Sequence, residues 1–407
     1  MSSRGFRTGL TLLVVAGIAV RLALAFGSQG LVFDLRSYVL TDHALGSHPL
    51  HVYALVNGPS AYRWPYLSGM FPLLLLARGI GDVSGLAFTS LIRLPAILGD
   101  VGIALVLEAF LRRRGCPARL RLLAAGAVLL GPLFVINSAY DGQSDSLAIL
   151  PAMVAVAMWK PAPSPGRAVA AGALIGVGCA LKTFPLLMVL AVLPSCSWRE
   201  RWLLVLAALA VPALAIAPWL VADGHSVVQA LKYHSLTGTG GISLLVQPDL
   251  ARIWLGQPFR HLTAASRALQ GSLGTVVLVL PVALAAGLAW VRRASAHQAA
   301  VLLWLTVFAV GVNFGARYAI WGLPFFLMAG QLWRSLAIQV VLVVPTVLLR
   351  AAPLSGHGVL YLYVTLMLMS WVAFAAWWIA EARGLVVGAP TPWPASQAGQ
   401  VPSTPRS

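Results

Sequence analysis

Long uninterrupted apolar runs recur along this chain of 407 residues and restrict its fold more than any other feature. A run of about 20 apolar residues is long enough to cross a bilayer as a helix. Only 10 % of the residues are charged, whereas a soluble domain carries about 25 %. The runs are continuous and do not alternate. They therefore predict an all-α polytopic membrane bundle and exclude an ordinary soluble or disordered chain.

The distribution of basic residues predicts the orientation of that bundle. The formal net charge is +17, and the basic residues lie between apolar runs, as they do in the cytosolic loops of membrane proteins. This placement argues against nucleic acid as a partner. Alternating the runs across the membrane predicts about twelve spans with both termini in the cytosol. The predicted spans are 8–26, 86–111, 120–136, 146–159, 168–181, 184–193, 202–221, 273–291, 299–313, 318–330, 336–349 and 359–380.

Two segments differ from these spans. A short apolar run at 67–76 contains Pro72, and a span there would place Arg112 and its two basic neighbours outside the cell. This run is therefore predicted to be an interfacial or re-entrant helix in the first external loop. The membrane domain is expected to cover residues 1–384, and a Pro/Ser-rich, disordered cytosolic tail is expected at 385–407.

Asp34 is the first candidate catalytic residue, because it follows the first predicted span closely. A carboxylate at the membrane–water boundary would be partly desolvated, and this suits a general base acting on a hydroxyl. A solvated loop aspartate and a helix N-cap are the structural alternatives.

Other carboxylates lie in or near the predicted spans. Gln143 and Asp145 belong to a polar turn, where Asp145 is equally well explained as a helix N-cap. Asp100 lies inside a span, where a charge costs at least about 2.5–3.5 kcal/mol and needs a partner or a polar cavity. An ion pair with Arg93 or Arg21 is the structural alternative for Asp100.

Lys182 and Arg317, which Tyr318 follows, are predicted near the outer headgroup level. Arginine binds a phosphate as a bidentate fork and lysine as a point charge, so the two cations suit a phosphate lying in the bilayer. Snorkelling to lipid phosphates is the alternative for each residue. The histidines match no metal-ligand spacing and no nucleotide-binding motif is present, so no metal or other cofactor is expected.

Taken in order along the chain, several motifs resemble those of the GT-C glycosyltransferases, membrane enzymes that use polyprenyl-phosphate sugars. The motifs are Asp-Leu-x-x-Tyr at 34–38, a Gly and a Tyr at 46 and 53, Tyr-Arg-Trp-Pro-Tyr at 62–66, Asn-Ser-x-x-x-Gly-Gln-x-Asp-Ser at 137–146, Lys-x-x-Pro at 182–185 and Arg-Tyr-x-x-Trp-x-x-Pro at 317–324. The resemblance covers residues 6–330 and is greatest to two subgroups, the bacterial polyprenyl-phosphate mannosyltransferases and the catalytic subunit of GPI mannosyltransferase I. One departure is Asp141, which stands where an aromatic residue commonly precedes Gly-Gln.

The resemblance implies transfer of a hexose from a polyprenyl-phosphate donor to a lipid-linked, glycan or protein acceptor, with inversion of the anomeric centre. Mannose is the favoured hexose. Asp34 would be the general base, and Lys182 and Arg317 would stabilise the phosphate. The further substrate-binding candidates are Tyr38, Arg63, Asp100, Gln143, Asp145 and Tyr318.

The resemblance also implies a site on the extracytoplasmic face, among membrane lipids. Of the basic residues only Lys160, Lys182 and Lys232 are lysines, a bias typical of a GC-rich bacterial genome, so a bacterial plasma membrane is expected. A transporter or lipid flippase, with Asp100 on the translocation path, is the main alternative. A non-catalytic subunit that holds a lipid is a third possibility.

Overall fold

The computed structural model describes residues 2–58, 61–62, 64–160, 163–232, 238–351 and 357–387. These residues are almost entirely helical, apart from the two-residue strands β1 (Asn57–Gly58) and β2 (Ala61–Tyr62), which pair antiparallel. The predicted all-α bundle is therefore confirmed.

Seven helical segments of the described chain are long and apolar enough to cross a membrane. They are α1 (Ser3–Gly27), α5 (Phe88–Leu91) with α6 (Leu94–Arg113), α7 (Ala118–Leu129) with α8 (Pro132–Val135) and the π-helical turn η3 (Ile136–Tyr140), α12 (Trp198–Leu231), α15 (Ser272–Val291), α18 (Leu332–Arg350) and α19 (His357–Val387). The chain is a multi-pass membrane protein.

The other predicted spans are helical but shorter. They are α9 (Asp145–Met158), α10 (Pro165–Leu181), the run of η4 (Phe184–Leu187), α11 (Met188–Val192) and η5 (Leu193–Ser195), α16 (Ala296–Val310), and η7 (Ala316–Trp321) with α17 (Leu323–Met328). Every predicted span thus has a helical counterpart, whereas a count of twelve crossings is not established, because these segments are shorter than the length a full crossing requires.

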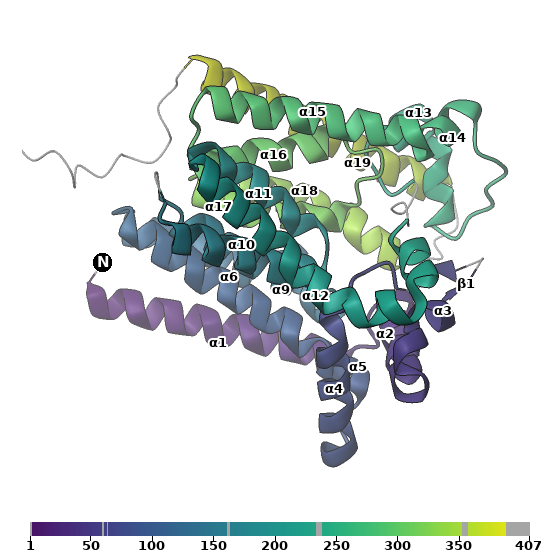
Figure 1. Cartoon of the computed structure of the whole chain (residues 1–407). Coiled ribbons are helices and arrows are strands. Elements are labelled where there is room, and N and C mark those ends of the chain that lie inside the picture. The colour runs from purple at the N-terminus through teal and green to yellow at the C-terminus, as the bar shows by residue number, and fades with distance from the viewer. Residues whose placement is uncertain are drawn as a thin grey trace, which may run out of the picture.

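The two large loops fold into short helices at the end of the bundle opposite the start of α1 (Figure 1). The first loop contains α2 (Val32–Ser47), η1 (Pro49–His51), α3 (Val52–Val56), η2 (Ser68–Met70) and α4 (Phe71–Ser84), and the second contains α13 (Ile242–Val246), η6 (Pro248–Ile253) and α14 (Ala264–Gln270). In Figure 1, α4 runs across the direction of α1 and α6. It exposes Leu76 and Val83, as expected of an interfacial helix.

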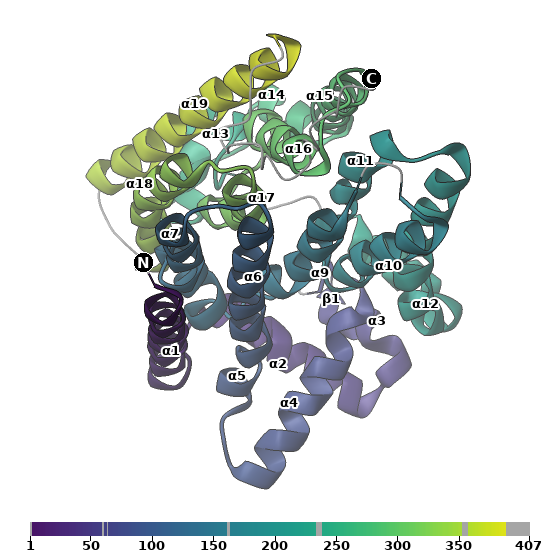
Figure 2. The same cartoon turned by 90° about the vertical axis from the view of Figure 1, so that its left-hand side faces the viewer.

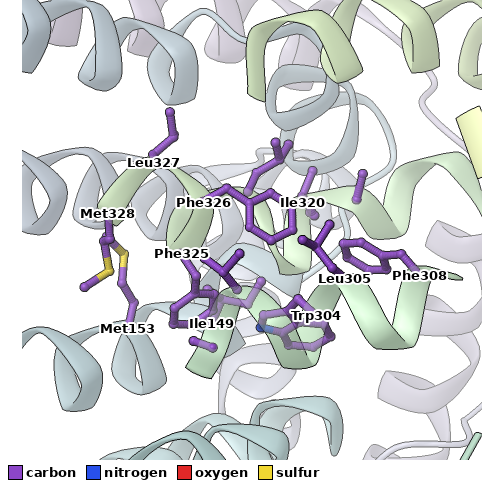
Figure 3. Close-up of a cluster of buried hydrophobic side chains, with 14 of the residues drawn as sticks. Ile149, Met153, Trp304, Leu305, Phe308, Ile320, Phe325, Phe326, Leu327 and Met328 are labelled. Carbon is purple, nitrogen blue, oxygen red and sulfur yellow. The ribbon is translucent and has the colours of Figure 1, made fainter. Parts of the chain in front are cut away.

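The core lies around α16 and α17, which are buried on nearly all sides. Viewed from the end where α1 begins, α17 lies among α6, α16 and α18 (Figure 2). Trp304 and Phe308 of α16 face Phe325 and Phe326 of α17, and Ile149 of α9 joins the same cluster (Figure 3). Helices apolar all round are typical of such a central position.

A close helix contact joins α10 to α12. A Cβ atom added to Gly172 would come 2.3 Å from the carbonyl oxygen of Leu204, and one added to Gly176 would come 2.9 Å from that of Ala208. Only glycine allows the two backbones to approach this closely.

Two helices extend beyond the predicted spans. α12 continues ten residues past 221, through a break at Asp223, because its last turns pack on the first loop, where Val227 and Ala230 are buried in the same cluster as Val52 and Tyr53. α19 continues to Val387 and so covers the first residues of the predicted tail. The rest of that tail, 388–407, lies outside the described residues.

Candidate active site

Asp34 lies in the first turn of α2, just beyond the end of α1. Its Oδ2 accepts a hydrogen bond from Nη1 of Arg317 at 2.6 Å, and its side chain is only 12 % exposed. Leu31 is the N-cap of α2. Asp34 is therefore neither a solvated loop aspartate nor a helix cap, and the structure pairs it directly with a cation that the sequence assigned to the same site.

Arg317 comes from η7 and faces a second carboxylate. Its Nη1 lies 3.9 Å from Oδ2 of Asp141, which follows the π-helical turn η3 and is fully buried. Burial alone would lower the pKa of Arg317, but the facing carboxylate of Asp34, with Asp141 and nearby tyrosines, raises it above the ordinary value. Arg317 is therefore charged at every accessible pH.

Arg350, the last residue of α18, completes a row of four alternating charges. It binds Asp141 through two nitrogens, with Nε 2.6 Å from Oδ1 and Nη2 in contact with Oδ2. Such paired contacts fix the planar guanidinium firmly. The sequence interpretation missed the Asp141–Arg350 pair. The one indication of this pair in the sequence was that Asp141 stands where GT-C enzymes commonly have an aromatic residue.

A buried arginine stabilises the turn beneath these charges. Arg93, at the start of α6, donates through Nη1 to the carbonyl oxygens of Ala25 and Ser28 at the end of α1, and to that of Ala139. These carbonyls are the unpaired acceptors of a helix end and a π turn. Arg93 therefore joins α1 to the segment that carries Asp141.

Lys182 is the centre of a second cluster, between α10 and the turn before α9. Its Nζ donates to Oε1 of Gln143 at 2.6 Å and to Oδ1 of Asp145 at 2.7 Å. Nδ2 of Asn137 donates to the other carboxylate oxygen of Asp145 at 3.2 Å. Ser144 is the N-cap of α9, so Asp145 serves as the partner of Lys182 and not as a cap.

Two tyrosines lie between the Lys182 cluster and Asp34. Nζ of Lys182 lies 5.0 Å from the ring centre of Tyr66, and Tyr38 packs edge-on against Trp64. Burial raises the pKa of both phenols, and the negative charges of Asp34 and Asp145 add to the rise. Both hydroxyls are therefore neutral at pH 7. Within the described chain, the buried hydroxyl of Tyr38 has no hydrogen-bond partner.

A cavity of about 160 Å³ opens beside the row of charges. Its polar lining is Asp34, Arg317, Tyr318, Thr239, Thr346 and Arg350, and its apolar lining includes Phe33, Trp254 and Leu349. Among the described residues the hydroxyl of Thr346 is buried without a partner. Buried hydroxyls are normally paired, so Thr346 is an exception among the described residues.

A second cavity of about 320 Å³ lies against Tyr318 and Trp321. It runs along the start of α15, with Leu278, Val307 and Val312 on its walls. The two cavities share Tyr318, which stacks on Trp321 with ring centres 4.3 Å apart. The two cavities therefore meet at one side chain.

Asp100 lies away from these cavity walls. Its Oδ2 accepts from Nε of Arg21 at 2.8 Å, its Oδ1 contacts the hydroxyl of Ser146, and its side chain is fully buried. This is the ion pair with Arg21 that the sequence left open as the structural alternative.

Two further expectations concern Arg63 and metal ions. Arg63 lies outside the described residues. Within the described ranges, no three His, Cys, Asp or Glu side chains gather as metal ligands would.

These features define a polytopic membrane protein with paired carboxylates and cations around a cavity at one end of its bundle. The sequence model of glycosyltransferase family 87 matches residues 70–316, more than half of the chain, and the chain belongs to this family. The protein is therefore a membrane glycosyltransferase, and the resemblance to GT-C enzymes is confirmed. Family membership decides against the transporter and the non-catalytic subunit.

The matched residues contain Asp141, Asp145 and Lys182, end one residue before Arg317, and do not include Asp34. Among solved structures, the crystal structure of ArnT from Cupriavidus metallidurans in the apo state is similar at 18 % sequence identity. The similarity covers 93 % of this chain and 78 % of that chain, with a TM-score of 0.40. No curated protein matches the chain.

Proposed function

We propose that this glycosyltransferase moves a hexose from a polyprenyl-phosphate donor to a lipid-linked, glycan or protein acceptor. Mannose is the hexose we favour. The observation that carries the proposal is that Asp34 and Arg317 line one cavity, where a general base and a phosphate-binding cation can reach the same substrate.

In the proposed reaction, Asp34 accepts the proton of the acceptor hydroxyl as that oxygen attacks the anomeric carbon. The new glycosidic bond forms while the bond from that carbon to the phosphate oxygen breaks, and polyprenyl phosphate leaves with the electron pair. Attack from the face opposite the phosphate inverts the anomeric centre. General-base assistance is worth about 10²–10⁴-fold, and Arg317, on the cavity wall, stabilises the charge that develops on the phosphate. Lys182 does not line this cavity and holds Asp145 and Gln143 beside it.

The arrangement of the bundle supports an extracytoplasmic site. α6 begins beside Arg93, close to the charged cavity, and ends at Arg113 after 20 residues, a length of about 30 Å. The basic residues Arg112, Arg113 and Arg114 therefore lie at the opposite end from Asp34, and such clusters favour the cytosol. The preference for arginine over lysine, typical of a GC-rich bacterial genome, supports a bacterial plasma membrane as the location.

The cavity along α15 supports a lipid-linked donor. Its apolar walls and its contact with Tyr318 would place an isoprenoid chain next to a phosphate held at Arg317. The segment 67–76, predicted from sequence as an interfacial or re-entrant helix, would then contribute to a lipid groove from the other side of the site through η2 and α4.

The experiment is a transfer assay on purified protein with polyprenyl-phosphate mannose, glucose and a pentose donor. We expect one donor to be consumed by the wild type and not by Asp34→Asn. Asp42→Asn is the matched control, because Asp42 lies on the same helix and pairs with Arg78, away from the cavity. Consumption of no donor, or equal rates for wild type and Asp34→Asn, would contradict the proposed function.

A further inference from the structure

The ion pair between Asp34 and Arg317 conflicts with the use of either residue in the reaction. A carboxylate that already accepts a charge-assisted hydrogen bond at 2.6 Å is a poor acceptor for another proton. The positive charge of the same guanidinium is already balanced by Asp34 before a phosphate arrives. A productive complex therefore requires this pair to separate.

Arg317 can separate from Asp34 by a short movement, because few contacts hold the two side chains together. Asp34 engages one terminal nitrogen, and within the described chain Arg317 donates no other hydrogen bond. Asp141 lies 3.9 Å from the same nitrogen and is itself held by Arg350. The remaining N–H groups suit two oxygens of a phosphate, since arginine binds phosphate in a bidentate manner.

We propose that Arg317 exchanges partners during the reaction: the donor phosphate takes the guanidinium from Asp34 and so frees the carboxylate to act as base. In this scheme, which rests on the proposed function, Asp141 and Arg350 are positioning residues that keep Arg317 at the cavity wall while it changes partner. The exchange also sets an order, in which donor binds before acceptor.

The charges favour exchange when a phosphate arrives. Two arginines and two aspartates cancel in the ligand-free row, so an added anion meets a net positive charge only if it displaces a carboxylate. The phosphate becomes more anionic as its bond to the sugar breaks, so its hold on Arg317 strengthens toward the transition state. Asp34 at the same moment is neutralised by the proton it accepts.

The exchange makes a prediction about binding that needs no turnover. Farnesyl phosphate must compete with Asp34 for Arg317 in the wild type, whereas in Asp34→Asn the guanidinium is already released. We expect Asp34→Asn to bind farnesyl phosphate about tenfold more tightly, which equals about 1.4 kcal/mol. The measurement is titration calorimetry in phosphatidylcholine nanodiscs, with Asp42→Asn as a control that keeps the wild-type Kd.

Further variants separate exchange from a general charge effect or a folding defect. In an Arg317→Ala background, the gain from Asp34→Asn should vanish, because no guanidinium remains to be released. Arg350→Ala should weaken binding about tenfold, and Arg350→Lys should recover part of that loss. Thermal unfolding of each variant, followed in the same nanodiscs, identifies any that fail to fold.

Three results would overturn the exchange. They are unchanged or weaker binding by folded Asp34→Asn, a gain that persists without Arg317, and no measurable binding by any variant. If sugar transfer is observed together with any of these results, the proposed function is retained and the exchange is rejected. Tighter binding by Asp34→Asn without transfer from any donor would support the exchange and reject the proposed donor.

Discussion

Replacing Lys182 with methionine tests the buried cluster of which it is the centre. Its side chain is 6 % exposed and that of Asp145 is 1 % exposed, so the ion pair is shielded from water. Lys182→Met would leave the carboxylate of Asp145 with the amide of Asn137 at 3.2 Å as its one remaining contact among the described residues. Removing one partner of a buried pair costs about 3–5 kcal/mol, because the other charge stays buried.

The assay is denaturant-induced unfolding in mixed micelles, which gives the free energy of unfolding. We expect Lys182→Met to lose about 3–5 kcal/mol and Lys182→Met with Asp145→Asn to recover more than half of that loss, since no bare charge remains. Lys160→Met, at an exposed lysine, is the control. A loss below about 1 kcal/mol, or a double variant no more stable than the single one, would refute the reasoning.

Three other outcomes follow from the structure. Gly172→Val should lower the free energy of unfolding by several kcal/mol, because its Cβ would meet the carbonyl oxygen of Leu204, whereas Gly166→Ala, in open space, should change it little; equal losses would contradict the close contact of α10 with α12. Tyr38→Phe should leave the free energy of unfolding unchanged or raise it slightly, because it removes a buried hydroxyl that has no partner among the described residues, and a clear loss of stability would contradict this. EDTA should not reduce transfer, and a loss that Mg²⁺ or Mn²⁺ restores would show a metal requirement.

Most helices could be predicted because long apolar runs are easily recognised in the sequence. The C-terminal end of α12 could not, since its apolar run stops near Val221 while the helix continues on contacts with the first loop, such as those of Val227 and Ala230. Likewise, α19 continues past Ala380 to Val387, although the predicted span ended at Ala380. Tertiary contacts at a helix end leave no periodic pattern in the sequence.

Most residues of the candidate site could be predicted from the sequence, but the ion pairs that they form could not. The membrane topology placed Asp34, Lys182 and Arg317 at one end of the bundle, but 283 residues separate Asp34 from Arg317, and no local pattern predicts which cation faces which carboxylate. Arg350 is the clearest case. It ends an apolar helix, where snorkelling explains an arginine equally well, and only the packing of α18 brings it to Asp141, 209 residues away.

The central claim is that a carboxylate base and a phosphate-binding cation act together in one cavity. The most direct measurement is a cryo-EM structure of the protein with a non-transferable polyprenyl-phosphate sugar analogue. The account predicts the phosphate on the guanidinium of Arg317, with the Asp34 carboxylate released from it and facing the anomeric carbon. A phosphate bound elsewhere, with the pair of Asp34 and Arg317 intact, would contradict it.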